Sequence, residues 1–203
     1  MSTLIPTYVY TEMTPNPNSM KFVADRMLIV GGDVAEFQDS VAAKEGSPLA
    51  LALFEFPFVK TVFIMGNFVT VSKDASMDWD LVKNELREFI QRYLMEDKPV
   101  IVEGYSTDIP ASSPEKLKMM AEHKVGNELE QKIADLLDEY VRPAVEKDGG
   151  AIQLDSFQNG VVSVVLRGSC SGCPSSTATL KGGIENLLTS MMPEVREVVA
   201  ING

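Results

Sequence analysis

The sequence is short of metal-ligating and nucleophilic side chains: its 203 residues include two cysteines and one histidine. Two cysteines cannot build the disulfide framework of a small secreted protein. A hydrolytic site that pairs a nucleophile with histidine would have to recruit His123 from a polar, proline-bearing stretch. The Gly-x-x-x-x-Gly-Lys-Ser/Thr phosphate loop is also absent. We therefore expect no enzyme.

The sequence also lacks a basic region. The formal net charge is −11, with 9 basic and 15 acidic side chains in residues 1–104 and 9 and 14 in residues 105–203. Because the acidity is spread evenly, no face is expected to attract nucleic acid or an anionic membrane. No stretch approaches the ~18 apolar residues of a membrane span. Residues 1–6 resemble neither a secretory signal nor an arginine-rich transit peptide, which predicts a cytoplasmic protein.

The overall composition of the chain suits two small α+β domains. Hydrophobic residues make up 45% of the chain and charged residues 23%, as in ordinary globular proteins. We expect a first α+β domain over residues 1–104 and a second over residues 127–203. The stretch between them, residues 105–126, is polar and contains prolines, so it is predicted to be a flexible linker.

Hydrophobic periodicity and turn residues predict the elements of each domain. In the first domain, strands are expected over residues 7–11, 20–23, 27–30, 59–65 and 68–71, and helices over residues 49–54 and 78–94. In the second domain, the expected order is α-β-β-α-β: a helix over 127–146, strands over 151–157 and 161–166, a helix over 175–191 and a strand over 195–201. Pro143 is expected to kink the first of these helices or end it early.

The two cysteines form a Cys-x-x-Cys motif, Cys170 and Cys173, between the strand 161–166 and the helix 175–191. Thiolates at i and i+3 on a turn converge on one centre, so zinc sites, iron–sulfur clusters and dithiol redox enzymes all use this spacing. Gly172 lets the backbone approach a metal closely, and the start of the following helix favours thiolate over thiol. Inert thiols are the remaining interpretation.

The number of protein ligands that each kind of site needs separates the metal, cluster and redox interpretations in part. Zinc and [4Fe–4S] sites usually take four protein ligands, whereas this chain offers Cys170, Cys173 and His123. Two copies related by a two-fold axis would supply four thiolates to one shared cluster. A cluster held between subunits is easily released, which suits a carrier. A dithiol/disulfide oxidoreductase using the Cys170–Cys173 pair and a structural zinc protein remain open.

Three further features lie near the motif in sequence. Arg167 and Lys181 either offset the negative charge of a ligated site or lie on a solvated surface. The pair Gly182-Gly183 permits close helix packing or the approach of a partner chain.

Each half of the chain contains a characteristic set of motifs. In the second half they are residues 140–145, Asp148-Gly149-Gly150, residues 166–176 and residues 179–185. In the first half they are residues 14–22 and residues 54–63. Through these motifs the second half resembles the NifU-like C-terminal domain, and the first half resembles the N-terminal domain of Nfu scaffold proteins. One departure from the NifU pattern is Ala151, where many relatives carry an acid.

The resemblance implies an Nfu-type iron–sulfur cluster carrier. It implies a homodimer that bridges a labile [4Fe–4S] cluster, with [2Fe–2S] as the other cluster type, through Cys170 and Cys173 of each chain. The expected partners are an upstream assembly scaffold, which supplies the cluster, and apo iron–sulfur proteins, which receive it. Asp148, Gly149 and Gly150 would shape a turn that packs beside the cysteine loop without ligating the cluster.

Overall fold

The computed structural model describes residues 4–30, 34–103, 105, 124–171 and 174–202, with the backbone alone described for 124–127, 174–176 and 202. The chain divides into two compact units, Met1–Thr107 and Asp108–Gly203. Each unit contains helices and one sheet, so the prediction of two α+β domains is confirmed. Most of the expected linker, residues 106–123 with His123, lies outside the described residues, and its boundaries stay a prediction.

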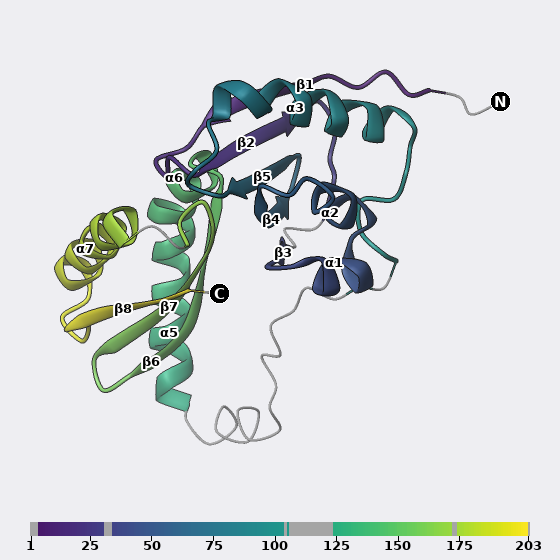
Figure 1. Ribbon diagram of the computed structural model, residues 1–203. Coiled ribbons are helices and arrows are strands. Elements are labelled where there is room, and N and C mark those ends of the chain that lie inside the picture. The colour runs from purple at the N-terminus through teal and green to yellow at the C-terminus, as the bar shows by residue number, and fades with distance from the viewer. Residues whose placement is uncertain (1–3, 31–33, 104, 106–123, 172–173, 203) are drawn as a thin grey trace. The chain divides into compact units, whose positions relative to one another are not determined.

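The first unit is a five-stranded antiparallel sheet with three helices packed on it (Figure 1). The strand order is β1-β2-β5-β4-β3, with β1 at Val9–Met13, β2 at Ser19–Ala24, β3 at Val34–Phe37, β4 at Val59–Met65 and β5 at Phe68–Lys73. The helices are α1 at Ser40–Gly46, α2 at Pro48–Leu53 and α3 at Trp79–Met95. Alternate residues of the strands, such as Val62 and Ile64 of β4, share one core with the helix residues Leu49, Leu86 and Ile90.

The predicted start of α2 is confirmed in detail. The Ser47 hydroxyl accepts a hydrogen bond from the amide of Ala50 at 3.0 Å, and Pro48 occupies the first turn, where a missing amide hydrogen costs nothing. The prediction of a strand over residues 27–30 is wrong. The amides of Leu28 and Ile29 both donate to the carbonyl of Gly66, at 2.7 and 3.0 Å, so this segment is fastened to the β4–β5 turn.

Strand β3 and helix α1 have no counterpart among the sequence-based predictions. Helix α1 consists mainly of small or polar residues without an apolar stripe, and it is fixed by its cap: Asp39 Oδ1 accepts from the amides of Val41 and Ala42, at 2.9 and 2.8 Å. Its last residue, Gly46, is required by close packing, because a Cβ there would lie 2.4 Å from the ring of Tyr105.

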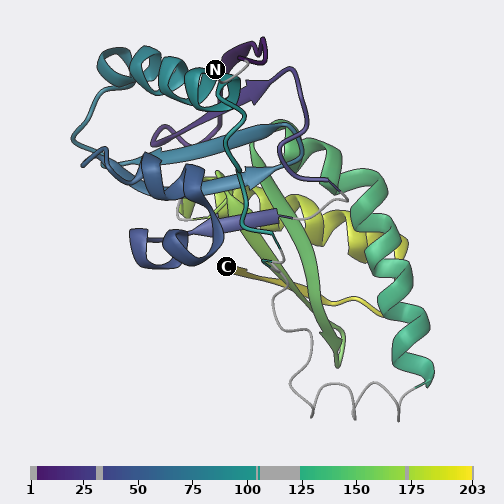
Figure 2. The ribbon, with the colours of Figure 1, turned by 90° about the vertical axis from the view of Figure 1, so that its right-hand side faces the viewer.

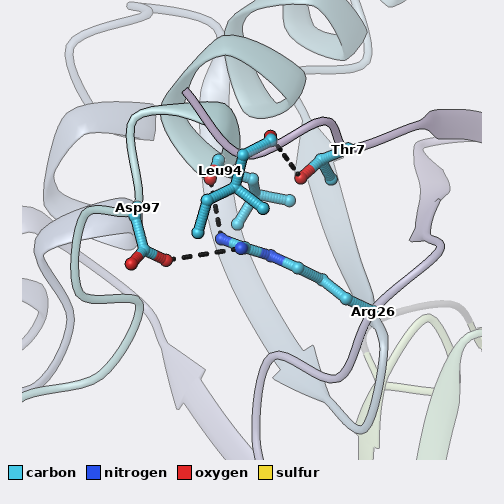
Figure 3. A network of polar contacts seen from close by, with 5 residues as sticks. Thr7, Arg26, Leu94 and Asp97 are labelled. Carbon is cyan, nitrogen blue, oxygen red and sulfur yellow. Dashed lines mark hydrogen bonds and ion pairs between the residues drawn. The ribbon is translucent and has the colours of Figure 1, made fainter. Parts of the chain in front are cut away.

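Arg26 caps the C-terminal end of α3 (Figure 3). Its Nη2 donates to the carbonyl of Leu94 at 2.7 Å, and its Nη1 lies 3.3 Å from Oδ1 of Asp97. The last carbonyls of a helix have no partner inside the helix, so the guanidinium supplies a missing donor. Asp97 ends the helix in the left-handed conformation, with φ of 52°.

The second unit is a three-stranded sheet with its helices sharing one core (Figure 1, Figure 2). Its elements are α5 at Lys124–Leu136, the π-helical turn η1 at Leu137–Val141, α6 at Arg142–Lys147, β6 at Gly150–Gln158, β7 at Val161–Gly168, α7 at Pro174–Met191 and β8 at Glu197–Asn202. The predicted α-β-β-α-β order is confirmed. Strands β6 and β7 form an antiparallel hairpin, and α7 carries the chain across to β8, which pairs with β7 in parallel.

Pro143 does not end the helix early, which was one of the two predicted outcomes. The preceding turn, Leu137–Val141, widens into a π-helical turn, and the helix continues to Lys147. Proline has no amide hydrogen and its ring crowds the turn before it, which the wider turn relieves. The helix therefore leads directly into Asp148-Gly149-Gly150.

Candidate functional site

The candidate site begins where β7 ends. Gly168, the last residue of β7, has φ of +66°, a conformation that suits glycine, and the chain turns there into Ser169, Cys170 and Ser171. Residues 172–173 lie outside the described residues, and α7 starts at Pro174. The structure thus places Cys170 between β7 and α7 as predicted, whereas the position of Cys173 stays a prediction.

The side chain of Cys170 is buried, with 8% of its surface exposed, and belongs to the core of the second unit. It rests against Gly150, the first residue of β6. A Cβ added to Gly150 would lie 2.9 Å from the Cys170 sulfur and 2.6 Å from the carbonyl oxygen of Arg167. Glycine is therefore the residue that leaves room for the thiol at this position.

The turn Asp148-Gly149-Gly150 holds the start of the cysteine loop. The Ser169 amide donates to the Gly149 carbonyl at 3.2 Å, and the Ser169 hydroxyl donates to the Asp148 carbonyl. Gly149 takes a left-handed φ of +81°, which presents these carbonyls to the loop. The predicted contact between this turn and the loop is present.

Two more hydroxyl groups fix the loop backbone. Ser171 donates to the Gly168 carbonyl through both its amide, at 3.1 Å, and its Oγ, at 2.8 Å. Thr177 of α7 donates from Oγ1 to the carbonyl of Cys170 at 3.1 Å. The backbone on both sides of Cys170 is therefore held by hydrogen bonds from neighbouring elements.

Burial raises the pKa of the Cys170 thiol, and the negative charge of Asp148 raises it further, while the hydrogen bond with the Ser169 hydroxyl opposes both. In the metal-free protein this thiol is protonated near neutral pH. A soft metal displaces that proton when it binds, because metal coordination deprotonates a thiol outright. Lys181 is one of the two cations that the sequence suggested near the motif. Its Nζ lies 3.9 Å from Oε1 of Glu197 in β8, so that carboxylate offsets part of its charge.

The donor set near Cys170 is soft. Within the described part of the chain, no three histidine, cysteine, aspartate or glutamate residues gather as a group that could hold a metal ion. A hard cation such as Mg²⁺ or Ca²⁺ requires several oxygen ligands, whereas thiolates select iron–sulfur clusters, zinc or copper(I). The thiol of Cys170 is therefore a ligand of the kind that iron–sulfur clusters, zinc and copper(I) all accept. None of the described helices is both long and apolar enough to cross a membrane.

Comparison with known families accounts for both halves of the chain. Residues 9–97 match the family described as scaffold protein Nfu/NifU N terminal, and residues 133–199 match the NifU-like domain. The chain belongs to the Nfu family. The second match contains the cysteine loop and its supporting turn, and the first covers the sheet and α3 of the other unit.

Curated relatives of this Nfu-family chain carry the name NFU1 iron-sulfur cluster scaffold homolog, mitochondrial. The relative from Drosophila willistoni is 37% identical over 194 residues, which cover 94% of this chain and 62% of the relative. The relative from Drosophila virilis is 38% identical, over 94% of this chain and 60% of the relative. This chain therefore spans somewhat less than two thirds of the length of these relatives.

Solved structures show weaker likeness. The solution structure of a NifU-like protein from Saccharomyces cerevisiae gives a TM-score of 0.43 at 23% identity, over 51% of this chain and 88% of that protein. A crystal structure of a Staphylococcus aureus protein gives a TM-score of 0.36 at 19% identity, over 41% of this chain and 98% of that protein.

The cytoplasmic prediction is wrong, because the matched relatives are named as mitochondrial proteins. That prediction rested on the composition of residues 1–6.

Sequence reasoning found the cysteines and the Asp148-Gly149-Gly150 turn, but it missed two contacts. Thr177 was not singled out, and nothing in a run of serines and threonines marks which hydroxyl reaches the Cys170 carbonyl. The packing of Gly150 on the Cys170 sulfur was also missed. The signal for it was present: paired glycines at the start of a strand favour the close approach of another segment.

Proposed function

We propose that this Nfu-family chain is an iron–sulfur cluster carrier, in which two copies hold one [4Fe–4S] cluster as cargo between them and pass it to apo-proteins. The observation that carries the proposal is the placement of Cys170: a thiol fixed at the end of β7, in a chain whose other cysteine stands three residues later. The names of the curated relatives support the scaffold role.

The ligand set follows from the number of cysteine thiolates in each chain. A [4Fe–4S] cluster takes four cysteine thiolates, and one chain provides Cys170 and Cys173. A second copy, related by a two-fold axis, provides the other pair. The described part of the chain gathers no other histidine or carboxylate cluster that would complete the set within one subunit.

Transfer proceeds by ligand exchange. A thiolate of the acceptor binds an iron atom of the cluster, and the bond from that iron to Cys170 or Cys173 breaks. The departing sulfur takes up a proton, and repetition at the remaining ligands moves the whole cluster without any change in its oxidation state. The cluster enters by the reverse exchange from an upstream assembly scaffold.

The alternative, a dithiol/disulfide oxidoreductase, fits the environment of Cys170 poorly. The reactive cysteine of such an enzyme is exposed and has a lowered pKa, which makes it a nucleophilic thiolate. Cys170 is buried, and burial raises its pKa.

Anaerobic reconstitution with iron and sulfide tests the proposal. The wild-type chain should give a brown protein with stoichiometric iron and acid-labile sulfide, and Cys170→Ser and Cys173→Ser should each lose the cluster while keeping a native circular dichroism spectrum. Full cluster content in either variant would overturn the ligand assignment. A metal-free protein that turns over disulfide substrates would favour the oxidoreductase.

A further inference from the structure

One hydrogen bond joins the two ends of the cysteine loop. The hydroxyl of Thr177, in the first turn of α7, donates to the carbonyl oxygen of Cys170 at 3.1 Å. The two residues are seven positions apart in sequence, and Cys173 lies between them. The bond therefore closes a ring of backbone that contains both cysteines.

The Cys170 end of this ring is anchored in the core. Its side chain is buried against Gly150, and the preceding Ser169 is bonded to the Asp148 and Gly149 carbonyls. Because β7 is the central strand of the sheet, this end has little freedom to move.

The α7 end is held by contacts spread along the helix. Among the side chains described in this helix, the first to be buried is Ile184, followed by Leu188, and Glu185 accepts from the Val198 amide at 3.0 Å. These contacts fasten the later turns of α7 to β8. Before them stand Gly182 and Gly183, where an added Cβ would meet nothing within 4 Å. Leu180, which precedes the glycine pair, is partly buried against the core, and the Thr177 hydroxyl joins the first turn of the helix to Cys170.

We propose that Thr177 is a positioning residue that holds Cys170, one of the two cluster-binding cysteines, against the first turn of α7. The consequence of this role for the cluster rests on the proposed function, whereas the effect of the Thr177 hydroxyl on the cysteine loop does not. Without the hydroxyl, the start of α7 is released from Cys170, the buried thiol becomes accessible more often, and the two thiolates of a chain hold a cluster less well.

Two substitutions isolate the hydroxyl. Thr177→Val keeps the branched shape and removes the donor, and Thr177→Ser keeps the donor and removes the methyl group. Thr189→Val is the matched control in the same helix, because the exposed Thr189 hydroxyl bonds to the Glu185 carbonyl at 2.6 Å, far along the chain from the cysteines. A general loss of helix stability would appear in both valine variants.

The first measurement needs no cluster. In a Cys173→Ser background Cys170 is the sole thiol, and its rate of alkylation in metal-free protein at fixed pH reports how often the loop opens. Thr177→Val should raise this rate about threefold to tenfold, the range that the net contribution of one hydrogen bond produces. Thr177→Ser and Thr189→Val should stay near the parent rate. An unchanged rate in Thr177→Val, or a rise in Thr177→Ser equal to it, would overturn the proposal.

The second measurement uses the reconstituted full chain with both cysteines. Thr177→Val should lose its cluster absorbance to a chelator about threefold to tenfold faster than wild type, with Thr177→Ser restoring the slow rate. Equal rates in wild type and Thr177→Val would overturn the positioning role. If the wild type itself binds no iron and sulfide, the proposed function fails, and the alkylation rates still decide what Thr177 does.

Discussion

Gly150 and the sulfur of Cys170 are in contact: a single carbon added to Gly150 would lie 2.9 Å from that sulfur. The glycine is the first residue of β6, and the cysteine follows the end of β7, the strand that pairs with it. The position of the thiol therefore depends on a residue twenty positions earlier, in the turn that ends the preceding helix.

We predict that Gly150→Ala displaces the Cys170 thiol. The new methyl group would also lie 2.6 Å from the Arg167 carbonyl, which belongs to the strand and cannot move aside easily. Overpacking of this kind should lower the free energy of unfolding of the second unit by about 1–3 kcal/mol. Denaturant unfolding followed by circular dichroism measures the change, and reconstitution should show reduced cluster content. Wild-type stability together with full cluster content would contradict the packing described here.

Gly182→Ala is expected to have the opposite effect on stability. Gly182 lies inside α7, and an added Cβ meets no described atom of this chain within 4 Å. Alanine in place of glycine in a helix interior should therefore stabilise the metal-free protein by about 0.5–1 kcal/mol. Thermal unfolding of the metal-free chain measures it.

The same variant tests why the glycine pair is there. The sequence suggested that the glycine pair permits close helix packing or the approach of a partner chain. Among the described residues, no other helix of this chain packs closely on Gly182 and Gly183, whereas the approach of a partner chain stays a prediction. If a second copy packs on these glycines, Gly182→Ala should raise stability and lower the yield of cluster-loaded dimer. A stabilised variant that loads normally would exclude that contact.

Tyr93 makes the stability of the first unit depend on pH at the alkaline end. Its hydroxyl donates to the Pro99 carbonyl at 2.8 Å, and burial raises its pKa from 10.0 to about 12. Folding thus favours the protonated tyrosine, so this contribution is complete below pH 10 and is lost as the pH rises toward about 12.

We predict that Tyr93→Phe lowers the free energy of unfolding near neutral pH by about 0.5–1.5 kcal/mol. The difference from wild type should shrink as the pH passes from 10 to about 12. Trp79, the sole tryptophan, lies in the first unit, so its fluorescence during urea unfolding reports on this unit alone. A difference that stays constant across that pH range would show that the hydroxyl is not the cause.

The elements that the sequence predicted well have strong local signals. Helix α3 carries an apolar stripe, the β6–β7 hairpin turns at Asn159-Gly160 with φ of 53° and 83°, and α2 starts at Ser47-Pro48. The strand that was wrongly predicted over residues 27–30 is instead decided by a contact between distant residues. Residues 27–30 are apolar enough for a strand, but the Gly66 carbonyl binds two of their amides.

The same distinction applies to the site. The spacing of Cys170 and Cys173 is visible in the sequence and points to soft-metal chemistry. The burial of Cys170, its raised pKa and its hydrogen bond from Thr177 all come from packing between β6, β7 and α7. A linear pattern of residue types does not show which glycine or which hydroxyl makes these contacts.

The most direct test of the shared-cluster proposal is iron and sulfide content per chain, measured together with mass in solution on anaerobically reconstituted protein. Two chains that share four thiolates should give one [4Fe–4S] cluster per dimer. Removal of the cluster should remove the contact that the cluster bridges between the two chains. A monomer that keeps a full complement of iron and sulfide would contradict the account, because one chain supplies two cysteines.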